Sequence, residues 1–307
     1  MQERIFWNVM GGRVLGPAPF FVVGIVNATP DSFYDGGLHE HEAPAVAHGK
    51  RLLAEGAAVI DVGGESTRPG ASQVDAAEET RRVLPVIRQL AEHIHRAEAN
   101  HGAEKGPASA VSVDTTKAGV AALALEAGAS IVNDVSAGRF DPELLDVLGQ
   151  YKPGYVLMHS LGRPETMQQA PVYENVVSEI IAFFEERMRA LTQAGVPEEN
   201  IVVDPGVGFG KTLEHNLEIL RNIEAFGVLG LPVFVGLSNK SMFQQLLGLS
   251  VKDRGAATQV ATAVLASRGV RIHRVHDVAQ TVQTLTVAEA LRRRTAPGDP
   301  REAMPGV

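Results

Sequence analysis

The chain has 307 residues, of which 45% are hydrophobic, 21% are charged and none is cysteine, and its formal net charge is −8. This composition excludes a disordered or collagen-like chain, disulfides, thiolate metal ligands and cysteine nucleophiles. No apolar run approaches the ~18 residues that cross a bilayer, and the negative charge argues against a binder of nucleic acid or membrane surfaces. The first ten residues do not resemble a secretory signal, so we expect a cytoplasmic protein.

Short apolar runs recur along the chain at regular intervals. Each is about strand length and rich in Val and Ile, which is typical of strands buried on both faces. They lie at residues 21–26, 58–62, 110–113, 130–132, 155–158, 201–203, 233–235 and 272–275.

Stretches with helical spacing of apolar residues separate these runs. The clearest predict helices at residues 43–55, 172–194, 215–226 and 277–294. About eight strand–helix units predict an α/β fold, a single-domain (β/α)8 TIM barrel over residues 1–294. A doubly wound open sheet is the alternative, because its local pattern is the same. Residues 99–107 are predicted to form a surface loop and residues 295–307 a loose C-terminal tail.

Polar residues close nearly every predicted strand at its carboxyl end, where a barrel of this kind holds its chemistry. Asp114, Asn133 and Asp204 would supply acceptors for the N–H groups of a flat heterocycle. A second set carries positive charge and suits a phosphate or diphosphate. Its members are Arg68, Lys240, Arg274 and His276.

Three other features have their own interpretations. Asn27 near Asp31 and Asp35 offers oxygen ligands for Mg²⁺. Asp277 is interpreted as the cap of the last helix and His159 as an ordinary loop histidine whose hydrogen bonds are satisfied.

Residues 205–212, PGVGFGKT, nearly match a phosphate-binding loop. The required first glycine is replaced by Pro205, and Asp204 would bring a carboxylate close to the phosphates. The strand at 233–235 also ends in glycine rather than in a magnesium-binding aspartate. We therefore interpret this stretch as a false match rather than as a nucleotide site.

Several motifs resemble those of the dihydropteroate synthase family, in order and over nearly the whole chain. The most specific are GIVNATPDSF at residues 24–33 and DVGGESTRPG at residues 61–70. The others are SVDT at 112–115, IVND at 131–134, LMH at 157–159, DPG at 204–206, SNKS at 238–241 and RVHD at 274–277. The family fold is a (β/α)8 barrel, in agreement with the prediction from the apolar runs.

The resemblance implies a reaction of folate biosynthesis. In it, 4-aminobenzoate displaces diphosphate from 6-hydroxymethyl-7,8-dihydropterin diphosphate and gives 7,8-dihydropteroate, by an SN1-like loss of diphosphate. Sulfonamides would act as mimics of 4-aminobenzoate. The resemblance further implies Mg²⁺ as cofactor and a homodimer, with no nucleic-acid or membrane partner.

The same resemblance implies roles for single residues. The pterin set is Asp114, Asn133, Met158, Asp204, Phe209 and Lys240. The diphosphate set is Asn27, Arg68, Arg274 and His276, with Asn27 also the metal ligand. The 4-aminobenzoate set is Phe33, Thr67, Pro69 and Ser241. The expected catalytic groups are Asp114, Lys240, Arg274 and His276.

Asn239 departs from the family pattern, because an arginine usually precedes the lysine at this place. The departure removes one cation from the edge of the site. One alternative is therefore a homologue that binds a pterin but has no catalytic activity. The pterin-binding domain of a methyltransferase is the other alternative, although it would not be expected to keep the Thr67-Arg68-Pro69 loop.

Overall fold

A parallel barrel of eight strands forms the centre of the molecule, in a computed structural model that describes residues 4–29, 42–65, 74–100, 108–164 and 166–292. The strands are β3 (Phe21–Asn27), β4 (Val59–Gly63), β5 (Ala110–Asp114), β6 (Ile131–Asp134), β7 (Gly154–Met158), β8 (Ile201–Asp204), β9 (Phe234–Val235) and β10 (Ile272–Val275). Their order is β8-β7-β6-β5-β4-β3-β10-β9. A bridge between Val203 and Val233 closes the ring. The predicted barrel is confirmed, and the open doubly wound sheet is wrong.

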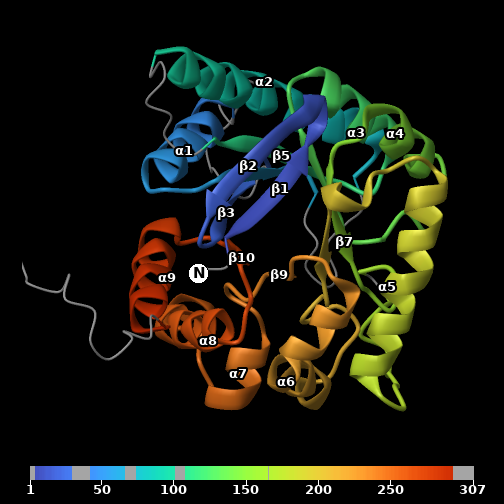
Figure 1. The fold of residues 1–307 in the computed structure, drawn as a ribbon, viewed down its shortest axis with the longest axis vertical. Coiled ribbons are helices and arrows are strands. Elements are labelled where there is room, and N and C mark those ends of the chain that lie inside the picture. The colour runs from blue at the N-terminus through green and yellow to red at the C-terminus, as the bar shows by residue number, and fades with distance from the viewer. Residues whose placement is uncertain (1–3, 30–41, 66–73, 101–107, 165, 293–307) are drawn as a thin grey trace, which may run out of the picture.

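Helices surround the strands (Figure 1). They are α1 (Glu42–Ala54), α2 (Ala76–Asn100), α3 (Ala118–Glu126), α4 (Leu144–Tyr151), α5 (Val176–Gln193), α6 (Leu213–Arg221), α7 (Met242–Leu247), α8 (Gly255–Ser267) and α9 (Val278–Arg292). Short 3₁₀ turns are η1 (Met10–Gly12), η3 (Glu198–Asn200), η4 (Ile223–Leu229) and η5 (Val251–Asp253). Among these described segments, no helix is long and apolar enough to span a membrane.

The predicted helix boundaries need three corrections. The helix predicted at 172–194 begins only at Val176, because the Asn175 side chain caps it by accepting from the Ser178 N–H. The helix predicted at 215–226 is divided into α6 and η4 at Asn222. Residues 99 and 100 belong to α2 rather than to a loop. Residues 101–107 and the predicted tail 295–307 lie outside the described residues.

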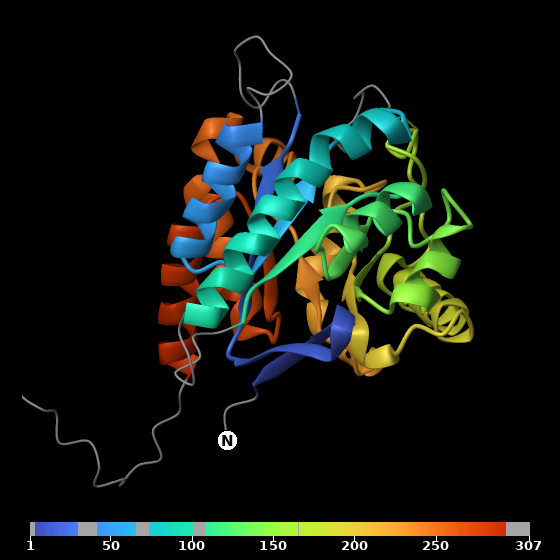
Figure 2. The same cartoon turned by 90° about the horizontal axis from the view of Figure 1, so that it is seen from above.

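An antiparallel hairpin of β1 (Ile5–Val9) and β2 (Arg13–Ala18), which the sequence analysis did not predict, closes one end of the barrel. It forms the lower edge of the molecule in Figure 2. Trp7 is 1% exposed, and its Nε1 donates to the Asn200 carbonyl at 2.8 Å. The hairpin packs on apolar residues near the amino ends of the strands, such as Phe21 and Ile272. This end is filled, so the chemistry belongs to the other.

The interior of the barrel changes from apolar to polar along each strand. Successive side chains of a strand alternate between its two faces, so residues two apart share a face. Val59 belongs to the apolar cluster under the hairpin, and Asp61 lies two residues further toward the carboxyl end. Ile272 and Arg274 repeat this pattern in β10. The strand order therefore brings charged side chains together above an apolar floor.

Candidate active site

The structure places the described members of the predicted site at the carboxyl ends of the strands. Asn27, Asp114, Met158 and Asp204 are the last residues of β3, β5, β7 and β8. Asn133 and Arg274 lie within β6 and β10, and the remaining members follow in the loops: Phe209, Lys240, Ser241 and His276. Phe33, Thr67, Arg68 and Pro69 lie outside the described residues, as do Asp31 and Asp35.

Arg274 lies at the centre of a network of charged hydrogen bonds. Its Nε donates to Asp61 Oδ2 and its Nη2 donates to Asp114 Oδ2, each at 2.7 Å. Asn133 Nδ2 donates to the same Asp61 oxygen at 2.9 Å. Residues predicted for the heterocycle and for the phosphates are thus joined through a buried carboxylate.

Asp61 was missed as a site residue in the sequence analysis. It is 1% exposed, and its second oxygen, Oδ1, has no hydrogen-bond partner among the described residues. A signal was available, because a carboxylate interrupts the apolar run Val59–Gly63 at an inward position. A buried charge needs partners, so such a residue indicates a cation nearby.

A second group gathers around Asp204. Asp204 Oδ1 accepts from the Gly206 N–H at 2.7 Å. Burial lowers the pKa of Lys240, and the Asp204 carboxylate opposes part of this shift. Lys240 Nζ lies 4.1 Å from the centre of the Phe209 ring, a cation–π contact. Phe209 and Met158 belong to one small apolar cluster, which also includes Val135 and Met167. Charge and apolar surface therefore adjoin each other here.

Burial changes the protonation of this site. It raises the pKa of Asp114 to about 7, although the Arg274 guanidinium acts in the opposite direction. It raises the pKa of Asp204 to about 6, where the Gly206 N–H and then Lys240 oppose the shift. It lowers the pKa of Lys240 to about 8. Such shifted groups are typical of sites that bind or process charged ligands.

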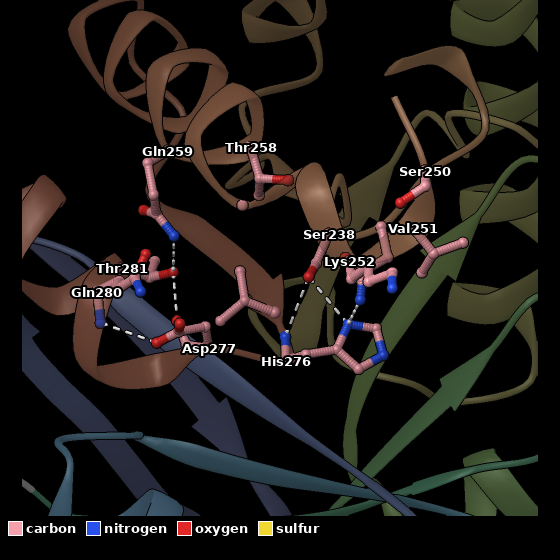
Figure 3. A pocket seen from close by; sticks show the side chains of 13 residues that line it. Ser238, Ser250, Val251, Lys252, Thr258, Gln259, His276, Asp277, Gln280 and Thr281 are labelled. Atoms are coloured by element: carbon pink, nitrogen blue, oxygen red, sulfur yellow. Dashed lines mark hydrogen bonds between the residues drawn. The ribbon is translucent and has the colours of Figure 1, made fainter. Parts of the chain in front are cut away.

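His276 lies on the wall of a cavity beside the barrel mouth, with a volume of about 490 Å³ (Figure 3). Its backbone N–H donates to Ser238 Oγ at 3.3 Å, and its Nδ1 lies 2.9 Å from the same oxygen. The first turns of α8 and α9 supply Thr258, Gln259 and Thr281 to the lining. The cavity thus extends from a predicted phosphate ligand to the helical shell.

Asn239 occupies a backbone position that favours its residue type. Its φ is +61°, in the left-handed region that asparagine tolerates better than most residues. Its carbonyl accepts from Arg254 Nη1 at 2.7 Å, and its Nδ2 lies 3.4 Å from His276 Nδ1. The departure from the family pattern therefore fits the local conformation.

The minor interpretations of the sequence agree with the structure. Asp277 caps α9, because its Oδ1 accepts from the Gln280 N–H at 3.0 Å. His159 is 6% exposed, and its Nδ1 lies 2.9 Å from Lys211 Nζ. Lys211 is 3% exposed and bonded to its own loop, so it does not reach out as a phosphate ligand would. The interpretation of 205–212 as a false match is consistent with this arrangement.

Comparisons with known proteins agree with this geometry. The family model described as "Pterin binding enzyme" matches residues 23–276, which is most of the chain, so the class of protein is that of the pterin-binding enzymes. The dihydropteroate synthase of Escherichia coli K12 is 40% identical over 269 residues, covering 88% of this chain and 90% of that protein. The chain therefore belongs to the dihydropteroate synthase family, transferases of folate biosynthesis. The resemblance to this family, the barrel fold and the transferase function expected from the sequence are confirmed.

Two solved structures extend the comparison. The dihydropteroate synthase of Xanthomonas albilineans with 4-aminobenzoic acid is 41% identical, with a TM-score of 0.83 over 94% of this chain and 100% of that one. The same enzyme in complex with 7,8-dihydropteroate is 39% identical, with a TM-score of 0.80 and the same coverage.

Proposed function

We propose that this chain joins 6-hydroxymethyl-7,8-dihydropterin diphosphate to 4-aminobenzoate, giving 7,8-dihydropteroate and diphosphate. The observation that supports this most directly is the network around Arg274. It sets acceptors suited to a flat heterocycle beside cations suited to a diphosphate. The ligands named in the Xanthomonas structures agree with the proposed substrate and product.

The pterin would lie between Asp204, Asn133 and Asp114, against Met158 and Phe209. Asn133 donates its amide N–H to Asp61, which leaves its Oδ1 as the atom that faces a ligand. The ligand must then present an N–H group at that point, as an amino-pyrimidinone edge does. Lys240, held over the Phe209 ring, would add a donor to the opposite edge.

The diphosphate would bind at Arg274 and His276, with Asn27 and Arg68. In the free protein, Arg274 donates from Nε to Asp61 and from Nη2 to Asp114. If a pterin N–H group donates to Asp114 instead, Nη2 becomes available to a phosphate oxygen. Binding of the two halves of the substrate would thereby support each other.

The donor set at Asn27 fits Mg²⁺ in a limited way. No group of three or more His, Cys, Asp or Glu that could hold a metal occurs in the described part of the chain. Mg²⁺ often takes only one or two protein oxygens and completes its shell with water and substrate phosphates. Asn27 offers one such oxygen. It pairs with Gly63 of β4, and Gly63 pairs in turn with Asp114 of β5, so the three residues lie at the same level of the barrel. When bound there, the ion would neutralise charge on the departing diphosphate.

The chemistry needs no nucleophilic side chain, because the neutral amine of 4-aminobenzoate is the nucleophile. The bond between the exocyclic CH₂ and the diphosphate oxygen breaks first, and both electrons leave with the diphosphate. Arg274 and His276 would stabilise the charge that develops on this group. The ionised Asp114 and Asp204 would stabilise the positive charge that develops on the pterin. The amine nitrogen then forms the C–N bond with this CH₂ carbon and loses one proton to solvent water.

The 4-aminobenzoate would lie at Ser241 together with Phe33, Thr67 and Pro69. Ser241 follows Lys240 directly and begins the turn into α7, so it can reach the same mouth of the barrel. Sulfonamides would compete for this place because they carry the same aryl amine.

A homodimer in the cytoplasm is the assembly we propose. Apolar side chains are exposed on neighbouring helices of the outer shell, where α8 packs on α9. They are Val260 and Val264 of α8 and Val287 and Leu291 of α9, and Leu246 and Leu247 of α7 and Val251 of η5 are exposed as well. An exposed apolar patch of this kind is typical of an interface. The absence of cysteine fits a reducing compartment.

Release of diphosphate on adding both substrates tests the function. We expect stoichiometric diphosphate and 7,8-dihydropteroate, and neither with 4-aminobenzoate alone. Pterin binding without turnover would support the silent homologue instead. Transfer of a methyl group to or from a bound pterin would support the methyltransferase alternative.

A further inference from the structure

The stretch 205–212, which resembles a phosphate-binding loop, directly follows Asp204, and Phe209 is the only one of its residues with a proposed role in the reaction. In a nucleotide site such a loop turns backbone N–H groups toward an anion. Here it does the reverse. The carbonyl oxygens of Gly206 and Phe209 each lie 3.0 Å from Lys211 Nζ, so the loop surrounds its own ammonium group.

Two further acceptors complete this cage. The His159 carbonyl lies 3.3 Å from Lys211 Nζ, and His159 Nδ1 lies 2.9 Å from it. Because Nδ1 faces an ammonium group, it must be the unprotonated nitrogen of the ring. Burial, followed by the charge of Lys211, lowers the pKa of His159 to about 2, so the ring is a neutral acceptor. The set of acceptors matches a lysine head group and leaves no place for a phosphate.

Glycine is required for the loop to close in this way. Gly206 has a φ of +67°, and a Cβ there would lie 1.9 Å from the His159 carbonyl oxygen. Gly210 also has a φ of +67°, and a Cβ there would lie 2.4 Å from the Leu161 Cβ. Glycine therefore stands at these positions for a reason other than nucleotide binding: the segment between β8 and α6 packs closely against the loop after β7.

The cage joins the elements that form the pterin wall. His159 follows Met158 at the end of β7, and its N–H donates to the Asp204 carbonyl at 3.0 Å. Gly206 donates its N–H to the Asp204 carboxylate at 2.7 Å. One lysine therefore connects the backbone next to the Met158 thioether, the Asp204 carboxylate and the Phe209 ring.

The electrostatic interaction between Lys211 and Asp204 also links the cage to the proposed pterin site. No carboxylate lies within ion-pair distance of Lys211 among the described residues, and Asp204 is the acid that acts on it most strongly. Burial lowers the pKa of Lys211 to about 7, and the Asp204 carboxylate opposes this shift. In turn, Lys211 and Lys240 both favour the ionised form of Asp204.

We propose that Lys211 is a positioning residue of the pterin subsite, which holds Met158, Asp204 and Phe209 in place and binds no phosphate itself. The inference rests on the proposed assignment of these three residues to the pterin.

Lys211→Met in the full-length chain tests the proposal, because methionine keeps the length but removes the donors. A misplaced binding wall can cost up to about a hundredfold, so we expect KM for the pterin substrate to rise about tenfold or more. KM for 4-aminobenzoate should stay within about twofold, since Ser241, the one of its proposed ligands that the structure describes, lies between β9 and α7 and is not part of the cage. Affinity for inorganic diphosphate should not change.

Two other variants keep the result interpretable. Arg271→Met removes a buried cation at the other end of the barrel, where Arg271 donates to the Ala266 carbonyl at 3.2 Å. It should lower the thermal midpoint without changing either KM. His159→Leu removes one acceptor of the cage and should reproduce the rise in pterin KM to a smaller extent, even where Lys211→Met fails to fold.

Three results would overturn the inference. Unchanged pterin KM in a folded Lys211→Met or His159→Leu protein is the first. An equal rise of both KM values would indicate general loss of structure, and a loss of diphosphate affinity alone would indicate a phosphate ligand. A native protein that forms no dihydropteroate would instead contradict the proposed function, so the two failures can be told apart.

Discussion

Arg274 is the residue on which the two halves of the proposed substrate meet. It forms two hydrogen bonds to buried carboxylates while standing in the set predicted for the diphosphate. Its guanidinium therefore balances the negative charge of two carboxylates in the free protein, and it would also balance the charge of the substrate's diphosphate.

Arg274→Ala should reduce kcat/KM by about a hundredfold to a thousandfold, the usual cost of removing a group that stabilises developing charge. It should also weaken binding of inorganic diphosphate. Steady-state kinetics and a diphosphate titration measure the two effects. If both are unchanged, the assignment of Arg274 to the leaving group is wrong.

Asp204 gives the site a dependence on pH. Its folded-state pKa is about 6, above the ordinary 3.8, because burial disfavours the charged form. Between these two values the folded protein binds more protons than the unfolded chain, so protonation of Asp204 stabilises the fold as the pH falls. Pterin binding has the opposite requirement, since the carboxylate must be ionised to accept the N–H groups.

Pterin affinity should therefore weaken as the pH falls below 6, by up to about tenfold per unit for one proton. Asp114, whose pKa is raised to about 7, should begin this loss at slightly higher pH. Titrations of a dihydropterin between pH 5 and 8 measure the effect, with Asp204→Asn as control. Equal slopes in the native and Asp204→Asn proteins would show that Asp204 is not the titrating group.

Single residues differed in how well the sequence predicted their places. Asp114 and Asp204 are the last residues of their strands, and Asn133 and Arg274 lie one residue before the ends of theirs. The order of parallel strands therefore sets all four at one mouth of the barrel. Asp61 was overlooked although a carboxylate inside an apolar strand is a signal, because the partners that explain it come from β6 and β10. Neither partner is near it in the sequence.

At the level of elements, the N-terminal hairpin illustrates the limit of local patterns. Its strands carry no long apolar run, and the surface they bury belongs to eight strands distributed over the rest of the chain. The strands of the barrel were easier to predict, because residues buried on both faces produce continuous Val- and Ile-rich runs. Helix boundaries depended on caps such as Asn175, which a periodic pattern does not contain.

Trp7→Ala tests whether the hairpin is a structural closure only. It should lower the free energy of unfolding by about 3–5 kcal/mol, because a large buried side chain is lost together with its hydrogen bond to Asn200. Denaturant unfolding measures this. KM for both substrates should remain unchanged at temperatures where the variant is folded. A selective rise in one KM would mean that the closed end communicates with the site.

For the molecule as a whole, the proposed dimer depends on the exposed apolar side chains of α7, α8 and α9. Val260 is 66% exposed at the middle of α8. Val260→Glu should convert the dimer to a monomer, because an unpaired charge at the centre of an apolar interface is strongly unfavourable. Sedimentation velocity of the native and variant proteins measures this. A native protein that already sediments as one chain would contradict the proposal.

The central claim is that one mouth of the barrel binds the ring by its N–H edge and the leaving group by its cations. A crystal structure with dihydropterin and diphosphate both bound tests it most directly. We predict the N–H edge within about 3 Å of Asp204 and Asn133 and the diphosphate on Arg274 and His276. A pterin bound at the hairpin end, or a diphosphate far from Arg274, would contradict the account.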